Sequence, residues 1–267
     1  MDATPHAYAE DLVEARAEIE RLKARIQEYR VELERAQEAE KEGREAARLA
    51  NDELQQFVYA ASHDLQEPLR TVSAYAQLLQ REYPQDGQAA EFAAFVITGA
   101  NQMSALVRDL LTYSRIRTEP NQDMIKLGTA LQRALLTLSE RIRASGAQVT
   151  SGELPEVFAD EAQIANIFEH LIGNAIRYRS SAPPVIRVTA EQDGETCTVS
   201  VQDNGVGIEP RFHEHVFQAF KRLHGKDVGG TGLGLTMCRK IVRAHGGRIW
   251  VESDGVHGST FKFTLAA

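Results

Sequence analysis

The chain has 267 residues, of which 43% are hydrophobic and 25% are charged, and this composition excludes an intrinsically disordered protein. Its 38 acidic and 30 basic residues give a net charge of -8, which argues against non-specific binding to nucleic acid or to an anionic membrane surface. The two distant cysteines and the lack of a long apolar run exclude a disulfide framework, a zinc cage and membrane insertion, and they predict a cytoplasmic location.

Residues 8–57 carry apolar or small side chains at heptad spacing, a pattern typical of a coiled coil. Glu18 and Lys23 have the spacing that pairs opposite charges across a parallel dimer, so we expect a parallel homodimer, with a solvated single helix as the alternative. A hinge or a frayed segment is expected near Glu40 and Gly43, where the pattern weakens. The two seams are Leu12, Ile19, Ile26, Leu33, Ala47 and Leu54, and Ala15, Leu22, Tyr29, Ala36, Ala50 and Phe57.

Two amphipathic helices follow, over 54–82 and about 89–116, separated by the helix-breaking loop EYPQDGQ. They predict a helical hairpin whose two apolar faces cannot be buried by each other alone. Because two hairpins together bury both faces, we expect two copies of the chain to form a four-helix bundle. The predicted coiled-coil dimer supplies the second copy.

The stretch SHDLQEPLR, residues 62–70, places a histidine on the first helix of the hairpin. Successive helix residues lie about 100° apart, so His63 is expected to point about 180° away from the mean direction of Ala61 and Leu65, and therefore outward. Two interpretations remain open, an ordinary surface histidine or a nucleophile displayed to a reaction partner. The neighbouring Asp64 could accept the imidazole proton or hold its tautomer.

Residues 124–267 mix helical and strand patterns. Two alternating segments around DGE give the strongest hairpin signal in the chain. We therefore expect an α/β sandwich, with helices layered on a mixed sheet. The expected helices are 127–146, 160–178 with Asp160 as N-cap, 212–221 and 233–245, and the expected extended segments are 146–160, 184–192, 196–203, 247–253 and 259–266.

Polar residues gather on one side of the helix predicted over 160–178. His170 lies four positions before Asn174, and Arg177 and Tyr178 lie three and four positions after it, which aligns the four residues along the helix. A side-chain amide oxygen suits a magnesium ion that carries phosphates, and a nearby cation and aromatic ring could serve a phosphate and a base. The residues concerned are His170, Asn174, Arg177 and Tyr178.

Two glycine-containing motifs occur in the same domain. DNGVGI, residues 203–208, places the acceptor Asp203 before Gly205 and Gly207, which let a ligand approach the backbone. GGTGLGL, residues 229–235, runs into a helix N-terminus, an arrangement that suits phosphate binding. One glycine loop also fits an ordinary turn, but three such polar elements in one domain favour a nucleotide site. The second motif contributes Gly230, Thr231, Gly232, Leu233 and Gly234.

Six motifs follow one another in a specific order: SHDLQEPLR, HLIGNAIRY, DNGVGI, VFQAFKRLH, GGTGLGL and GSTF. They resemble the phosphoacceptor, N, first glycine, F, second glycine and final strand boxes of the histidine kinases of two-component signalling, and more narrowly of the phytochrome-like subgroup. The resemblance covers about 50–267. It implies a dimerisation and histidine phosphotransfer domain at 54–118 and a Bergerat-type (GHKL) ATP-binding domain at 124–267, after the coiled coil at 1–53.

The resemblance also implies an activity, an ATP-dependent protein-histidine kinase that autophosphorylates His63 with Asp64 as the assisting base. The phosphoryl group would then pass to an aspartate of a response-regulator receiver domain. ATP and Mg²⁺ are the implied cofactors, and Asn174 is the implied magnesium ligand.

The implied nucleotide contacts come from several segments. By resemblance, Arg177 takes the place of a phosphate-contacting lysine, Tyr178 stands beside adenine, and Asp203 accepts a hydrogen bond from the adenine amino group. Thr260, in GSTF, joins the nucleotide-binding set. The aromatic residues that either anchor a mobile lid through HGKDVGG or pack in the core are Phe217 and Phe220.

Two positions depart from the family pattern. His170 replaces an asparagine that helps to hold magnesium or activate the histidine, so metal affinity or kinase rate is expected to fall, although imidazole can also act as a weak ligand or a base. Glu67 replaces a threonine or asparagine that orients water, so phosphatase activity is left open. The alternatives are a dimeric nucleotide-binding scaffold with weak or no kinase activity, and a chaperone- or repair-type ATPase, against which residues 54–116 argue.

Overall fold

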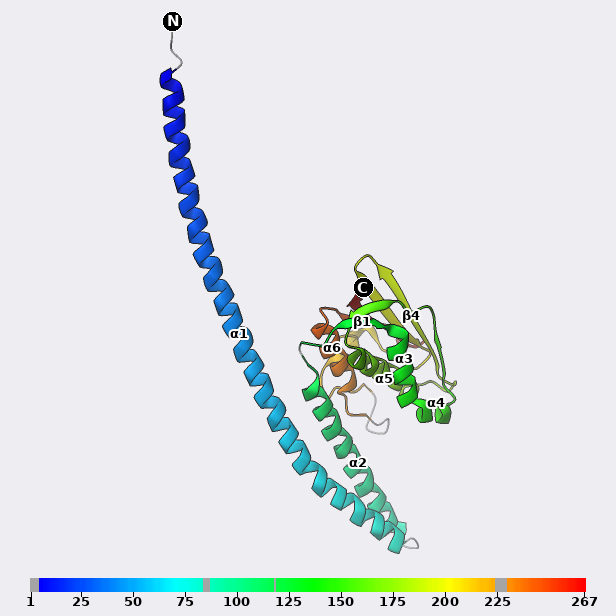
Figure 1. Cartoon of the computed structure of the whole chain (residues 1–267). Helices are drawn as coiled ribbons and strands as arrows, with labels where there is room; N and C mark the ends of the chain where they lie inside the picture. The colour runs from blue at the N-terminus through cyan, green and yellow to red at the C-terminus, as the bar shows by residue number, and fades with distance from the viewer. Residues whose placement is uncertain (1–4, 84–86, 118, 224–229) are drawn as a thin grey trace. The chain divides into compact units, whose positions relative to one another are not determined.

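Two units make up the computed structural model, residues 1–57 and 58–267, and each is described by itself. The structure describes residues 5–83, 87–117, 119–223 and 230–267; several side chains of the first helix, including that of His63, lie outside the description. That helix, α1 (Pro5–Glu82), begins in the first unit and ends in the second, and it is drawn from blue to cyan in Figure 1.

The part of α1 in the first unit is an uninterrupted helix, so the helix break expected near Glu40 and Gly43, as a hinge or a frayed segment, is wrong. A glycine costs a helix only about 1 kcal/mol, and the strong helix formers around it offset that cost. Leu22, Ile26 and Leu33 of the heptad seams are 47%, 58% and 58% exposed in the single chain. A partner is needed to bury such a stripe, and the coiled-coil dimer stays a prediction. No helix in the described ranges is long and apolar enough to cross a membrane.

The second unit begins with a helical hairpin, formed by residues 58–82 of α1 and by α2 (Gly87–Arg115) (Figure 1). Small side chains take several of the buried positions: Ala76, Ala93 and Ala100 are 5% exposed or less. Many larger apolar side chains of the same helices remain exposed, among them Leu65, Val72, Leu79, Phe92, Phe95 and Met103. One hairpin therefore leaves much of its apolar surface in water, as half of a four-helix bundle would.

A seven-stranded mixed sheet forms the centre of the rest of this unit. Its strand order is β1-β3-β7-β5-β4-β2, and β6 also pairs with β7. β2 and β4 are parallel and the other pairs are antiparallel, so the predicted mixed sheet and the predicted hairpin of β4 with β5 are confirmed. The strands are β1 (Asp123–Lys126), β2 (Gln148–Ser151), β3 (Glu156–Ala159), β4 (Val185–Asp193), β5 (Thr196–Asp203), β6 (Ile249–Glu252) and β7 (Thr260–Ala266).

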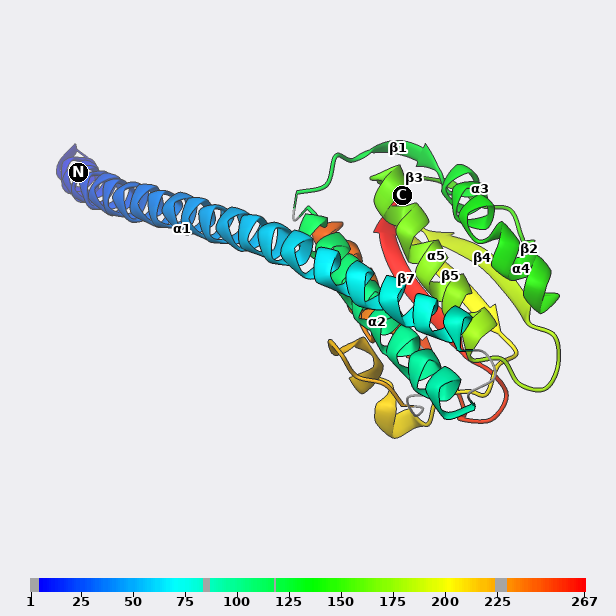
Figure 2. The same cartoon turned by 90° about the horizontal axis from the view of Figure 1, so that it is seen from below.

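Helices cover the sheet, with α5 (Glu161–Arg177) packed between α3 (Leu127–Thr137) and α6 (Gly234–Ala244) (Figures 1 and 2). The apolar sides of these helices and of the sheet form one core, in which the Phe168 ring meets the Phe263 ring edge to face, with centroids 6.1 Å apart. The predicted α/β sandwich is therefore confirmed.

The helix predicted over 127–146 is divided into α3 and α4 (Ser139–Ser145), with Leu138 between them. The Thr137 hydroxyl donates to the Arg133 carbonyl oxygen at 3.2 Å, a bond that bends helices.

The helix predicted over 212–221 is wrong. Two short 3-10 helices, η1 (Pro210–Phe212) and η2 (His215–Phe217), occupy the first part of this segment and the residues just before it. The chain leaves helical geometry at Gln218, where ψ is 142°. At Phe220 φ is 62° and the amide donates to the Gly232 carbonyl oxygen at 3.0 Å.

A buried histidine joins the end of α6 to the start of α5. The Nδ1 atom of His245 lies 2.9 Å from the Ile241 carbonyl oxygen, and its Nε2 atom accepts a hydrogen bond from the Asp160 amide at 3.0 Å. Because Nε2 is the acceptor, Nδ1 carries the proton and donates to Ile241. Asp160 in turn accepts from the Gln163 amide at 3.1 Å, which confirms it as the N-cap of α5.

Candidate functional site

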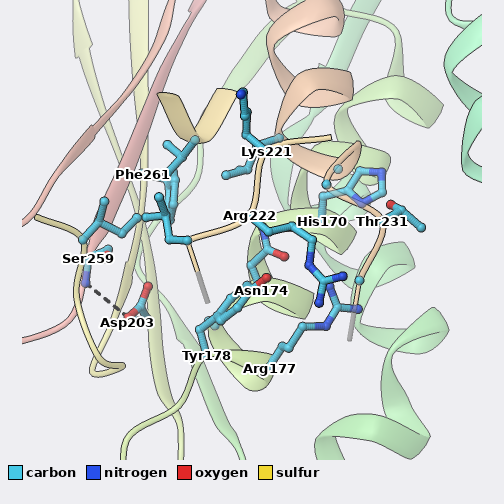
Figure 3. Close-up of a pocket in the computed structure, with 18 of the residues that line it drawn as sticks. His170, Asn174, Arg177, Tyr178, Asp203, Lys221, Arg222, Thr231, Ser259 and Phe261 are labelled. Carbon is cyan, nitrogen blue, oxygen red and sulfur yellow. Dashed lines mark hydrogen bonds between the residues drawn. The ribbon is translucent and has the colours of Figure 1, made fainter. Parts of the chain in front are cut away.

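A cavity of about 350 Å³ opens beside α5, between the turn after β5 and the glycine loop before α6 (Figure 3). It brings together residues that are far apart in the sequence. The residues of the predicted site that line it are His170, Asn174, Arg177, Tyr178, Asp203, Gly207, Gly230, Thr231, Gly232 and Gly234.

The polar side of α5 forms one wall of this cavity. Buried Ile and Phe side chains hold the opposite side of the helix against the sheet, so the three-and-four spacing turns the polar residues toward the cavity. Figure 3 shows Asn174 with Tyr178 and Arg177 to either side of it, and His170 near Thr231.

Asp203 closes the other end of the cavity, at the end of β5. Its Oδ1 accepts from the backbone amide of Gly205 at 2.8 Å. It also accepts from the backbone amide of Ser259 at 3.2 Å, the bond that is dashed in Figure 3. Burial raises the pKa of this carboxyl above its usual value, and the two amide hydrogen bonds oppose that rise. Among the described residues Oδ2 accepts no hydrogen bond, so a ligand that donates one can be recognised there.

Glycine is required where the loops pack on α5. At Gly230, with φ of 103°, a Cβ atom would lie 2.7 Å from Arg177 Nη1. At Gly205 it would lie 2.6 Å from the Tyr178 carbonyl oxygen, which also accepts from the Val206 amide at 3.1 Å. The positive φ of Gly230 and the close backbone approach at Gly205 both disfavour a side chain, and of the two Gly230 lines the cavity.

Four cationic side chains line the cavity, of which sequence reasoning found only Arg177. Lys221 and Arg222 were missed, although they belong to the quoted motif VFQAFKRLH. Arg141, on α4, belongs to none of the quoted motifs. Its Nη2 donates to the Gly173 carbonyl oxygen at 3.3 Å, and burial together with the charge of Arg177 lowers its pKa. Guanidinium groups gathered in this way favour a polyanionic ligand.

His170, on α5, also lines the cavity. Burial lowers its pKa, nearby Asp109 partly offsets this effect, and Arg177 lowers the pKa further. The imidazole is therefore neutral at neutral pH and can donate or accept a hydrogen bond. Asp109 comes from α2, where it accepts a hydrogen bond from the Thr231 hydroxyl. Sequence reasoning missed this residue too.

Other residues of the predicted site lie outside the cavity wall. Gly205 and Leu233 are buried behind it. Thr260 does not line it, whereas the adjacent Ser259 and Phe261 do. Asp64 and Glu67 are exposed on α1, and the side chain of His63 lies outside the described residues.

The two aromatic residues expected near the lid differ in their surroundings. Phe217 is buried, and its ring meets Phe261 edge to face with centroids 6.3 Å apart, while Phe220 is 60% exposed. The lid expected through HGKDVGG lies outside the described residues except for Gly230.

The described side chains contain no cluster of three or more His, Cys, Asp and Glu that could hold a metal ion. Magnesium does not need such a cluster, because it usually keeps several waters and binds substrate phosphates with one or two protein oxygens. The amide of Asn174, inside a cavity with cationic walls, fits an ion that arrives with a phosphate chain.

A helix-covered mixed sheet with a polar cavity, an acidic acceptor and a glycine loop defines a nucleotide-binding sandwich of the GHKL class. Residues 159–267 match the family of histidine kinase-, DNA gyrase B- and HSP90-like ATPases, and residues 53–119 match the His Kinase A (phospho-acceptor) domain. The chain belongs to the sensor histidine kinases of two-component signalling and contains their catalytic core.

Its relatives include phytochromes. It is 42% identical over 257 residues to cyanobacterial phytochrome A of Nostoc sp., covering 95% of this chain and 33% of that protein. It is 41% identical over 220 residues to the phytochrome-like protein Cph1 of Synechocystis sp., covering 81% and 29%. The chain thus spans about a third of the length of these curated relatives.

The fold is also similar to solved kinases. Full-length ShkA in complex with AMPPNP matches with a TM-score of 0.60 and 24% identity, over 79% of this chain and 46% of ShkA. The kinase ThkA in complex with the response regulator TrrA matches with a TM-score of 0.56 and 21% identity, over 79% and 61%.

Proposed function

We propose that this chain is an ATP-dependent kinase that phosphorylates its own His63 and passes the phosphoryl group to an aspartate of a response-regulator receiver domain. The observation that carries the proposal is the cavity that joins Asp203, the cationic side chains and the glycine loop. The match of residues 53–119 to a phospho-acceptor domain supports His63 as the acceptor. The complexes of ShkA with AMPPNP and of ThkA with TrrA support the nucleotide and the partner.

The proposed ATP pose follows from the chemistry of the walls. Asp203 Oδ2 accepts from the adenine amino group, with Tyr178 beside the base. The phosphates extend toward Arg177 and the N-terminus of α6, where backbone amides and the helix dipole favour negative charge. Magnesium, when bound at Asn174, neutralises charge on the phosphates.

The proposed reaction has a simple balance. The bond between the γ-phosphorus and the β–γ bridging oxygen breaks, a bond forms between that phosphorus and an imidazole nitrogen of His63, and ADP leaves. Asp64 accepts the proton that the imidazole loses. In the second step the phosphorus–nitrogen bond breaks as a carboxylate oxygen of the receiver aspartate bonds to phosphorus, and the released imidazole takes up a proton. The chain contributes mainly positioning and charge neutralisation.

We also propose a parallel homodimer in the cytoplasm. The exposed heptad seams of α1 and the exposed apolar side chains of the hairpin support the dimer, since a second copy would bury both. A division into a coiled coil at 1–53, a phosphotransfer domain at 54–118 and an ATP-binding domain at 124–267 is part of the proposal, and the two family matches support it.

The direct test is incubation of the chain with ATP labelled at the γ-phosphate. Label that is stable in alkali and lost in acid is the expected product, because a phosphoramidate has these properties. ATP binding without such label would favour the scaffold over the kinase.

Asn174→Ala is expected to weaken binding of magnesium-ATP about tenfold, the equivalent of roughly 1.4 kcal/mol, because the cavity loses the amide oxygen proposed to bind the ion. Isothermal titration with magnesium and with EDTA measures the effect, which should disappear in EDTA. An unchanged magnesium-dependent affinity would contradict the role of Asn174.

Arg141→Ala is expected to weaken ATP binding about tenfold and leave adenosine binding unchanged, because a charged contact near the phosphates is lost. Arg143 is the matched control, since it lies on the same helix, is exposed and does not line the cavity. Titrations of both variants with ATP and adenosine decide the matter. Equal losses in the two variants would refute a specific contact of Arg141.

A further inference from the structure

A carboxylate from the hairpin lies in the part of the cavity assigned to phosphate. Asp109 and Ala105, both on α2, line the cavity together with the glycine loop. Asp109 is also close enough to His170 to affect its titration, with an effect opposite to that of Arg177. The cavity is therefore partly closed by an element outside the ATP-binding sandwich.

The contacts of Asp109 resemble those of a bound phosphate oxygen. Its Oδ2 accepts from the hydroxyl of Thr231, and the same hydroxyl oxygen accepts from the Leu233 amide at 3.3 Å. Leu233 is the N-cap of α6. An anion thus lies at the glycine loop in front of a helix N-terminus, where unpaired amides and the helix dipole favour negative charge.

A second contact, one helical turn further along α2, holds the same two elements together. Lys240 of α6 donates through Nζ to the Tyr113 carbonyl oxygen at 2.9 Å, and its Nζ lies 4.4 Å from the centroid of the Tyr113 ring. Asp109 and Tyr113 are four residues apart, so they lie on the same side of α2. The carboxylate is held at the glycine loop by this docking of α2 on α6.

We propose that Asp109 is a built-in competitor of the terminal phosphate of ATP. While α2 is docked, its carboxylate occupies the Thr231 hydroxyl and repels a second anion from the loop. Binding of the triphosphate displaces Asp109 and frees the ATP-binding domain from α2. The inference rests on the proposed function, since it assumes that ATP is the ligand of the cavity.

Titration of the whole chain with ATP, ADP and adenosine tests the inference. Asp109→Asn keeps the size of the side chain and removes its charge, so ATP should bind about tenfold more tightly, ADP should gain less, and adenosine should be unchanged. Glu91→Gln, an exposed charge on the same helix, is the matched control and should leave all three affinities unchanged. Asp109→Ala should change them in the same direction as Asp109→Asn.

The outcomes separate the two proposals. Unchanged or weaker ATP binding by Asp109→Asn would overturn the inference alone, as would an equal gain for adenosine, which would indicate general opening of the cavity. Absence of ATP binding in the unaltered chain and in every variant would overturn the proposed function, and the inference with it.

Discussion

Replacement of His63 by alanine is expected to reduce incorporation of γ-phosphate label to background, while ATP affinity stays unchanged. The imidazole nitrogen is the proposed nucleophile, so no phosphoramidate forms without it. The nucleotide cavity is built from other residues, and its affinity for ATP should therefore survive. Filter-bound radioactivity after acid and alkali treatment measures the first quantity, and titration with a non-hydrolysable ATP analogue measures the second.

The matched control for this experiment is His257→Ala, which removes an exposed histidine paired with Asp254 on the catalytic domain. Its labelling should equal that of the unaltered chain. Retention of acid-labile label in His63→Ala would show that another histidine is the acceptor. Acid-stable label on serine or threonine would contradict the proposed chemistry altogether.

Asp203→Asn is expected to weaken ATP binding about 10- to 100-fold without unfolding the domain. Asparagine keeps an oxygen for the Gly205 and Ser259 amides, but it presents an NH₂ group where the adenine amino group needs an acceptor. Titration with ATP measures the loss. Unchanged affinity would mean that the base does not bind at Asp203.

The same substitution should raise the free energy of unfolding at neutral pH. Burial raises the folded pKa of Asp203, so the ionised carboxylate destabilises the fold once the pH rises through that value. Asparagine carries no such penalty. Urea unfolding at pH 7 and near pH 4 should show a larger advantage of Asp203→Asn at pH 7, and the reverse order would contradict the direction of the shift.

Elements with a strong local pattern were predictable from the sequence. Helix α5 combines a capping residue, Asp160, with a long amphipathic pattern, and β4 and β5 alternate around a two-residue turn signal. Elements whose structure depends on tertiary contacts were not predictable from the sequence. The segment near 212–221 has a helical pattern, but its end is fixed by the hydrogen bond from Phe220 to Gly232, which comes from the distant glycine loop.

The candidate site shows the same division. Asn174 was found because its spacing places it beside the other polar residues of one helix. Gly230 was found because it belongs to one continuous glycine loop, and both residues line the cavity. Arg141 and Asp109 reach the cavity from separate helices, and no local pattern marks them. The GSTF motif could not distinguish Thr260 from its neighbours, because successive strand residues point to opposite sides of the sheet.

The position of β7 has a consequence for the order in which the protein folds during synthesis. This strand pairs with β3, β5 and β6, all of which precede it in the chain. The helical segments can form as they leave the ribosome, but the sheet has no centre until residues 260–266 have emerged. A chain interrupted before Thr260 would leave the edges of β3 and β5 open to pairing with other chains. Nucleotide-binding capacity is therefore acquired only after residues 260–266 have emerged, long after the proposed acceptor His63 has been made.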